Sequence, residues 1–468
     1  MYLERIYDED LAQASYFIGC QAGGVALVLD PRRDIAEYLE LADRQGMRIT
    51  AVAETHVHAD FLSGTRELAA ATGATAYVSG EGGQDWQYSF PATHLHDGDE
   101  ITLGNITIRA RHTPGHTPEH LSFEVTDRAF SSEPGYLFTG DFVFAGDVGR
   151  PDLLDEAAGG TDTRFEGAQQ MYRSLREGLL QLPDHVQVYP GHGAGSACGK
   201  SLGALPATTI GYERLNAWWG RALADGDEGT FVDELLSGQP DAPAYFGRMK
   251  RQNLHGPRIL GELPSLAEMS AEQLAPLISS GEAIPIDLRA PEEVHQQAVR
   301  GAVTLPNPQK IAAHGAWALD PETDTQPLVV LATDVTQAEQ VRDHLIRVGI
   351  DQVQGYTTSI RGLETFTPSV LPPEDLAQFD AAAVVDVRNR SEHEAGHIPG
   401  SSQLSAGRVL AHREELPASG PVVTYCQTGV RNLVAAGALR RHGIDVVELD
   451  GSYAGWLDRV GQTSRAGR

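Results

Sequence analysis

The run Thr55-His56-Val57-His58-Ala59-Asp60 opens a loop directly after a buried apolar stretch, and it decides how the first half of the chain is interpreted. Two imidazoles at positions i and i+2, with a carboxylate two residues further on, can converge on one cation when such a loop curls. A lone His-x-His would more simply be a pair of surface histidines. The run therefore needs support from other parts of the chain.

That support comes from three later motifs, each of which follows an apolar stretch. They place His116 in Thr-Pro-Gly-His-Thr, Asp141 in Thr-Gly-Asp and His192 in Gly-His-Gly. Loops at strand ends are where functional side chains concentrate. Neutral imidazole and carboxylate suit zinc, iron or manganese better than magnesium or calcium. The set predicts a metal centre.

The segments around these motifs alternate between strands and helices. Residues 24–30 and 49–53 have the composition of buried strands, and residues 34–46 that of a helix ending at a glycine. Residues 207–245 are expected to be helical. The order of the motifs resembles the metallo-β-lactamase superfamily over residues 1–250. That resemblance implies an αββα sandwich with the metal at one edge.

Two branches of this superfamily differ in the number of metal ions. Glyoxalase II enzymes hold two metals with the motif T-H-x-H-x-D-H. Here the last histidine of that motif is replaced by Phe61. A second metal would then keep only Asp60, Asp141 and His192.

Persulfide dioxygenases are the other branch that the motifs resemble. Their single iron is held by two histidines and one aspartate, which leaves open positions for substrate and O2. The resemblance implies one Fe(II) per chain, with Zn as the alternative, held by His56, His116 and Asp141. The residues expected to surround that ion, or to hold a second one, are His58, Asp60 and His192.

Arg150 and Cys198 are candidates for contact with the substrate. Arg150 lies in Gly-Asp-Val-Gly-Arg-Pro-Asp-Leu and could steer an anionic substrate or form a surface salt bridge. Cys198 lies in the glycine-rich loop after His192, which makes it a candidate for a residue that borders the metal pocket and accepts or relays sulfur. Cys20 is expected to be a packing residue.

The second half of the chain contains an internal repeat, with one copy over residues 262–362 and the other over residues 372–468. Each copy alternates buried strands with helices at a spacing suited to a parallel sheet. The aligned pairs are Asp287 with Asp386, Arg289 with Arg388, Gly301 with Gly400, Leu328–Leu331 with Val422–Tyr425, and Gly355 with Gly451.

Only the second copy carries a thiol, Cys426, at the end of a buried strand. Backbone N–H groups of the loop that follows, and the start of a helix from Asn432, favour a thiolate there. Cys426 and its neighbours resemble rhodanese domains. That resemblance implies that Cys426 takes up sulfane sulfur as a persulfide, cradled by Gln427, Thr428, Gly429, Val430 and Arg431. Ala332 stands at the corresponding place in the first copy, which is therefore predicted to be an inactive rhodanese-like domain.

Composition and charge exclude several classes of partner. The chain of 468 residues has 64 acidic against 36 basic side chains and a net charge of -28. Nucleic acid and membrane are therefore poor candidate partners. No apolar run is long enough to span a bilayer, and the N-terminus lacks the features of a secretory signal. Three cysteines fit a reducing compartment, so a cytoplasmic location is expected.

Taken together, the expected class is a multidomain α/β protein, with a metallo-β-lactamase sandwich before two rhodanese-like domains with parallel sheets. This order resembles bacterial persulfide dioxygenase–rhodanese fusions of the staphylococcal sulfide-detoxifying type. The resemblance implies oxidation of a low-molecular-weight thiol persulfide by O2 to sulfite, followed by sulfur transfer through Cys426 that gives thiosulfate. The alternative is a zinc hydrolase of glutathione thioesters with an accessory rhodanese domain. A homo-oligomer is expected.

Overall fold

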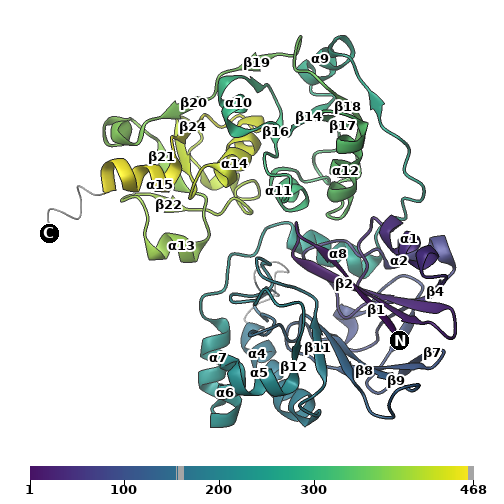
Figure 1. Ribbon diagram of the computed structural model, residues 1–468. Coiled ribbons are helices and arrows are strands. Elements are labelled where there is room, and N and C mark those ends of the chain that lie inside the picture. Colours follow the sequence, from purple (N-terminus) through teal and green to yellow (C-terminus); the bar gives the residue numbers. More distant parts are fainter. Residues whose placement is uncertain (154, 156–162, 462–468) are drawn as a thin grey trace. The chain divides into compact units, whose positions relative to one another are not determined.

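The computed structural model describes residues 1–153, 155 and 163–461 (Figure 1). The chain forms two compact units. The first contains Met1–Gln239 and Phe246–Leu263, and the second contains Pro240–Tyr245 together with the chain from Pro264 onward. Within the part of the chain that is described, no helix combines the length and the hydropathy needed to cross a bilayer.

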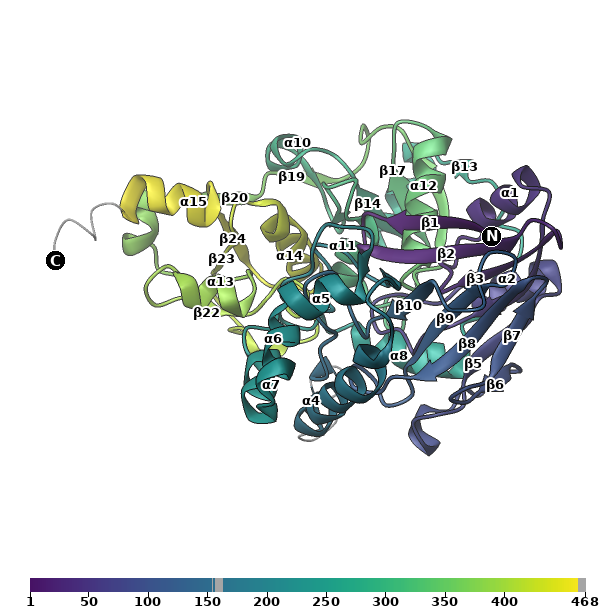
Figure 2. The same cartoon turned by 60° about the horizontal axis from the view of Figure 1, so that its bottom comes forward.

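The first unit contains two six-stranded sheets. In the first sheet, the order β1-β2-β3-β4-β5-β6 follows the chain, with antiparallel pairing as far as β3 and parallel pairing beyond it. Its strands are β1 (Tyr2–Asp8), β2 (Gln13–Cys20), β3 (Val25–Leu29), β4 (Arg48–Ala53), β5 (Thr75–Ser79) and β6 (Thr93–Leu95). Figure 2 shows β1 and β2 lying side by side as a long pair.

The second sheet has the order β12-β11-β10-β9-β8-β7 and is antiparallel except for the pair of β10 and β11. Its strands are β7 (Glu100–Leu103), β8 (Ile106–His112), β9 (Leu121–Asp127), β10 (Tyr136–Gly140), β11 (Gln187–Pro190) and β12 (Thr208–Thr209).

The two sheets pack face to face, and helices cover their outer faces. Because alternate residues of a strand point to opposite faces, Tyr16 of β2 packs against Phe138 of the other sheet, whereas Phe17 faces the helices. The helices are α1 (Ala36–Arg44) and α2 (Thr65–Thr72) on the first sheet, and α4 (Arg164–Arg173), α5 (Ile210–Asn216), α6 (Trp218–Asp225) and α7 (Glu228–Leu236) on the second. The expected αββα sandwich is confirmed.

The second unit contains two five-stranded parallel sheets. The first has the order β13-β18-β17-β14-β16. Its strands are β13 (Ala267–Glu268), β14 (Ile284–Asp287), β16 (Val303–Thr304), β17 (Leu328–Leu331) and β18 (Val353–Thr357). Its helices are α9 (Ala271–Ser279), α10 (Pro291–Gln296), α11 (Ile311–Ala318) and α12 (Val335–Ile346). A separate two-stranded ribbon joins β15 (Ala298–Val299) to β19 (Thr365–Phe366).

The other parallel sheet of this unit has the equivalent order, β20-β24-β23-β21-β22. Its strands are β20 (Ser369–Leu371), β21 (Ala383–Asp386), β22 (Ser402–Gln403), β23 (Val422–Tyr425) and β24 (Val446–Leu449). Its helices are α13 (Arg390–Ala395), α14 (Val430–Arg441) and α15 (Ser452–Trp456). The predicted parallel α/β architecture is therefore confirmed.

The structure corrects two details of the sequence analysis. Gly355 pairs with Val329 in the first sheet, whereas Val447 pairs with the equivalent Val423, so Gly355 does not correspond to Gly451. Helix α14 begins at Val430 and not at Asn432. The first unit also includes helix α8 (Phe246–His255), and the domain limits stay a prediction.

Candidate metal centre and sulfur-transfer loop

Three side chains from three separate loops meet in the first unit. His56 follows β4, His116 lies between β8 and β9, and Asp141 follows β10 directly. Asp141 Oδ2 lies 3.9 Å from His56 Nε2 and 3.6 Å from His116 Nε2. All three residues are almost fully buried. The structure thus brings together the three residues predicted to hold a metal ion.

Hydrogen bonds on the far side of each ring fix the tautomers of the two histidines. His116 Nδ1 donates to the backbone carbonyl of Arg150 at 2.9 Å. Thr55 Oγ1 donates to Asp30 Oδ2 at 2.8 Å, so the hydroxyl oxygen accepts the proton of His56 Nδ1 at 2.9 Å. The Nε2 lone pair of each ring therefore faces Asp141. Hydrogen bonds to the other ring nitrogen commonly orient metal-binding histidines in this way.

The charge states of this group suit a divalent metal. Burial lowers the pKa of both His56 and His116, so these rings are neutral. Burial would raise the pKa of Asp141, but His192 and the other nearby histidines outweigh it and hold that pKa well below its usual range. Asp141 Oδ2 is buried and has no hydrogen-bond partner among the described residues. A carboxylate oxygen facing two neutral imidazoles fits a metal ion held by all three side chains.

The residues expected at a second metal position are instead bonded to one another. His192 bridges two carboxylates, with Nδ1 2.7 Å from Asp141 Oδ1 and Nε2 2.8 Å from Asp60 Oδ2. Burial would lower the pKa of His192, but Asp141 and Asp60 raise it well above its usual value. The two carboxylates favour a proton on both ring nitrogens, so a metal ion bound by His192 would have to displace one of these protons.

His58 contacts a different set of carboxylates from those that contact His192. Its Nε2 lies 3.2 Å from Asp30 Oδ1 and 3.1 Å from Glu54 Oε2, and its ring lies 4.4 Å from the ring of Phe61. Phe61 is fully buried. The side chain that replaces the last motif histidine therefore packs against His58 and adds no ligand.

Sequence reasoning missed several residues that shape this site. Asp30 accepts hydrogen bonds from both the backbone N–H and the hydroxyl of Thr55, and its φ of +50° lies in the left-handed region. In the sequence, Asp30 could have been identified as a carboxylate at the end of the expected strand 24–30. Asn253 of α8 donates to the carbonyls of His58 and Phe61 and accepts from Ser63 N–H. Nothing local in the sequence points to Asn253.

Arg150 and Cys198 are both buried. Arg150 is 0% exposed, so the surface salt bridge is wrong: its guanidinium pairs with Asp152 Oδ2 at 2.6 Å inside the unit. Contact of Arg150 with a substrate stays a prediction. Cys198 lies beside Asp60 and His192, with candidate ligand atoms all within 4.8 Å of one another. Burial raises the pKa of its thiol to about 12, which disfavours the nucleophilic thiolate.

The second candidate site surrounds Cys426, at the end of β23 and one short loop before α14. Gly429 N–H donates to Cys426 Sγ at 3.1 Å, and Gly429 adopts a φ of +112° that favours glycine. The Cys426 carbonyl accepts from Tyr453 N–H at 3.0 Å, which ties the loop to the start of α15. A backbone donor aimed at the sulfur, at the N-terminus of a helix, is the environment that stabilises a thiolate or a persulfide anion.

Two arginines near this loop have different partners. Arg431, in the first turn of α14, binds both oxygens of Glu392 at 2.6 and 2.8 Å. Arg388 binds both oxygens of the buried Asp386 and also donates to Gln427 Oε1 at 3.1 Å. The contacts between Asp386 and Arg388 hold the end of β21, and the bond from Arg388 to Gln427 links this pair to the loop.

Comparisons with known proteins agree with this division of the chain. The metallo-beta-lactamase superfamily matches residues 9–192, and the rhodanese-like domain matches residues 373–459. Hydroxyacylglutathione hydrolase of Rhodospirillum rubrum is 32% identical over 51% of this chain and 80% of its own length. Persulfide dioxygenase ETHE1 of Bos taurus is 28% identical over 41% of this chain and 67% of its own length.

A solved structure extends the similarity beyond the first unit. The crystal structure of a metallo-beta-lactamase from Staphylococcus aureus subsp. aureus COL is 37% identical, with a TM-score of 0.66. It covers 76% of this chain and 98% of its own chain. With the sandwich fold and the strand-end histidines and aspartates already described, these matches show that the chain belongs to the metallo-β-lactamase superfamily and carries a rhodanese-like domain.

Proposed function

We propose that this chain is a non-haem iron persulfide dioxygenase coupled to a rhodanese sulfurtransferase. The first activity consumes a low-molecular-weight thiol persulfide, one O2 and one water, and gives the free thiol, sulfite and two protons. In the second, the Cys426 thiolate takes the outer sulfur of another thiol persulfide, which releases its thiol, and sulfite then attacks the outer sulfur of the Cys426 persulfide. The S–S bond then breaks, thiosulfate leaves, and the Cys426 thiolate is restored. Similarity to the bovine dioxygenase supports the first activity, and the rhodanese-like match supports the second.

One observation carries the choice of a single metal. Asp141 Oδ2 faces His56 Nε2 and His116 Nε2 and has no hydrogen-bond partner among the described residues, whereas the two nitrogens of His192 lie at hydrogen-bond distance from Asp141 Oδ1 and Asp60 Oδ2. Fe(II) bound by that group would supply the redox chemistry with O2 that side chains lack. The chain's own contribution is to hold both imidazoles neutral and oriented through Arg150 O and Thr55.

The residues around the site also control protons and water. His192 lies between Asp60 and Asp141, and a proton that it donates from either nitrogen can stabilise negative charge that develops nearby. Phe61, fully buried against His58, fills space with an apolar ring and excludes water from that side. Thioester hydrolysis at two metals needs a water molecule that the metal ions activate, and neither His192 nor Phe61 would supply that function.

Oxygen uptake with glutathione persulfide tests the proposal. Protein loaded anaerobically with Fe(II) should consume O2 and form sulfite and thiosulfate whose sum equals the O2 consumed, and metal analysis should find one iron per chain. His116→Ala should lose both the iron and the uptake. His94→Ala, at an exposed histidine of β6 outside the cluster, is the matched control and should keep both.

The alternative function is hydrolysis of a glutathione thioester, which the match to hydroxyacylglutathione hydrolase favours. It predicts two zinc ions per chain, release of thiol from S-lactoylglutathione and no O2 uptake. That combination of results would reject the dioxygenase.

We also infer a cytoplasmic location and a homo-oligomer. All three cysteines are buried free thiols, as in proteins of reducing compartments. Sedimentation velocity of the full chain measures the oligomeric state, and a monomer at micromolar concentration would contradict the second inference.

A further inference from the structure

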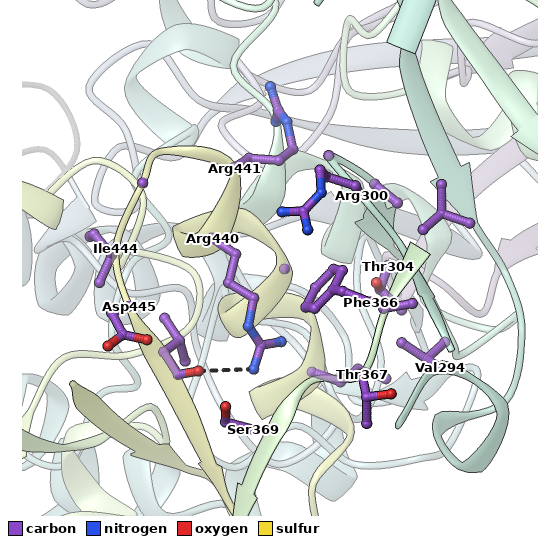
Figure 3. A pocket seen from close by; sticks show the side chains of 18 residues that line it. Val294, Arg300, Thr304, Phe366, Thr367, Ser369, Arg440, Arg441, Ile444 and Asp445 are labelled. Atoms are coloured by element: carbon purple, nitrogen blue, oxygen red, sulfur yellow. Dashed lines mark hydrogen bonds between the residues drawn. The ribbon is translucent and has the colours of Figure 1, made fainter. Parts of the chain in front are cut away.

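A cavity of about 370 Å³ lies in the second unit (Figure 3). Its wall is formed by the ribbon strands β15 and β19, by β16, by the C-terminal half of α14 and by the start of β24. None of its lining residues belongs to the group His56, His116 and Asp141 or to the loop Cys426–Arg431. Its volume lies within the range of small-molecule sites.

Much of this wall is apolar. Aliphatic side chains come from both parallel-sheet halves of the unit, namely Val294, Ala298, Val299, Leu433 and Ile444. The ring of Phe366, which is only partly buried, stands among them, and it also lines an adjoining hollow of about 500 Å³. An aromatic ring exposed to two hollows offers a surface on which a flat group can stack.

Two guanidinium groups flank that ring. The guanidinium carbon of Arg300 lies 5.3 Å and that of Arg440 lies 6.0 Å from the centroid of Phe366, and Figure 3 shows the three side chains around one hollow. Arg300 contacts Glu364 through Nε at 2.5 Å, which leaves its two terminal amino groups as donors. Arg440 is held by Glu448 Oε1 at 2.8 Å and by the Val446 carbonyl at 3.1 Å. Arg441 lies at the rim, where it pairs with Asp324 at 2.5 Å.

The acidic groups near the cavity are largely engaged elsewhere. Glu448 also contacts His295 Nε2 at 3.2 Å and Asn432 Nδ2 at 3.4 Å, so it orients Arg440 from behind the wall. Asp445 is the acidic residue among the lining side chains. Two arginines directed at one cavity contrast with a chain whose net charge is -28. Their fork geometry suits an anion with several oxygens, such as phosphate.

We propose that this cavity binds a phosphorylated nucleoside, with its phosphate on Arg300 and Arg440 and its base stacked on Phe366. The hydroxyl side chains of Thr304, Thr367 and Ser369 line the same space and match the polar edges of a sugar. An inorganic anion would leave the apolar wall and the ring uncovered. An apolar ligand without charge would leave the terminal N–H donors of Arg300 unused.

Calorimetric titration of the full chain with AMP and ADP tests this proposal. One saturable site per chain is expected, with adenosine and inorganic phosphate each binding at least about ten-fold more weakly, because each offers half of the contacts. Coenzyme A carries the same phosphorylated nucleoside and separates two sources. Tighter binding of coenzyme A assigns the site to a carrier thiol, and tighter binding of ADP assigns it to a free nucleotide.

Variants separate this cavity from any binding at the metal centre. Arg300→Ala removes a side chain that is 58% exposed and should weaken AMP binding about ten-fold while the protein remains folded. Phe366→Leu keeps an apolar side chain but removes the stacking surface, and it should weaken AMP but not inorganic phosphate. Arg361→Ala, at an exposed arginine outside the cavity, is the control and should bind as the wild type does.

Three results would overturn the proposal. They are no binding of AMP, ADP or coenzyme A at millimolar concentration, equal affinity of AMP and inorganic phosphate, and unchanged AMP affinity in both Arg300→Ala and Phe366→Leu. Circular dichroism of the variants shows that a loss of binding is not a loss of fold.

Discussion

The two parallel sheets of the second unit share a framework but differ at one loop. Both have the same strand order, and both carry an aspartate at the end of a central strand that binds the arginine two residues later. Arg289 Nη2 lies 2.6 Å from Asp287 Oδ2, and Arg388 Nη2 lies 2.7 Å from Asp386 Oδ2. The aspartate–arginine pair thus does not depend on the cysteine, because the sheet that lacks the cysteine keeps the pair.

The loops after the central strands β17 and β23 carry the difference. In the first sheet, Ala332 leads into a loop closed by its own side chains: Gln337 Oε1 accepts from Thr333 N–H at 2.7 Å, and Asp334 caps α12. In the second, Gly429 N–H points at Cys426 Sγ. The first loop satisfies its backbone donors internally, and the second directs a donor at sulfur. We infer that residues 262–362 are a rhodanese-like domain without sulfurtransferase activity.

Removal of the thiol is expected to have the largest effect. Cys426→Ser should lower thiosulfate formation by at least about 1,000-fold, because the nucleophile itself is lost. Sulfite formation from glutathione persulfide should stay at the wild-type rate. Ala332→Ser makes the matched change in the first sheet and should alter neither product. Thiosulfate formation by Cys426→Ser at the wild-type rate would mean that sulfur does not pass through Cys426.

Breaking the shared aspartate–arginine pair should have the next largest effect. Asp386→Ala leaves Arg388 buried without its partner and should lower the free energy of unfolding by about 3 kcal/mol. Asp287→Ala should cost less, about 1–2 kcal/mol, because the Arg289 side chain is 18% exposed against 3% for Arg388. Urea unfolding of the full chain measures both. Equal losses would show that exposure does not separate the two pairs.

The effect of Asp386→Ala should also depend on pH. Burial would raise the pKa of Asp386, but hydrogen bonds from Arg388 and His393 outweigh it and lower that pKa. A carboxylate whose folded pKa is depressed stabilises the protein fully above its unfolded pKa of about 4 and loses that contribution as the pH falls further. The stability gap between wild type and Asp386→Ala should therefore be constant near neutral pH and shrink below about pH 4.

A smaller effect is expected at Arg431, the cation that the first sheet lacks. Arg431→Ala removes positive charge beside the sulfur and frees Glu392, so sulfur transfer should fall roughly ten-fold. Arg459→Ala, at a more exposed arginine of the same half, is the control. A steady-state thiosulfate assay compares the two variants. An equal loss in both would remove Arg431 from the site.

The sequence predicted the framework and the metal cluster because both depend on local patterns. The paired Asp-x-Arg motifs and the glycines before β16 and β22 keep the same spacing in both copies, and Gly301 and Gly400 both have positive φ. His56, His116 and Asp141 each follow a strand, and strand ends meet at one edge. Neither prediction required knowledge of distant contacts.

The partners of these residues could not be predicted in the same way. Asn253 reaches His58 and Phe61 from a helix about 190 residues later in the chain, and no local pattern marks it. Arg150 is compatible with a surface position by composition, yet it is fully buried against Asp152. The error in matching Gly355 to Gly451 arose because a single glycine fixes no register. Strand pairing does fix it.

The smallest effect should come from restoring the missing thiol to the first sheet. Ala332→Cys, made in the Cys426→Ser background, should recover less than about 1% of wild-type thiosulfate formation, because a thiol needs donors that stabilise its anion. Asp334 lies two residues away and would repel that anion, and Gln337 already occupies the N–H of Thr333. Adding Asp334→Gly and Gln337→Arg should raise the rate above that of Ala332→Cys alone. If Ala332→Cys alone restored full transfer, the loop would not be what separates the two sheets.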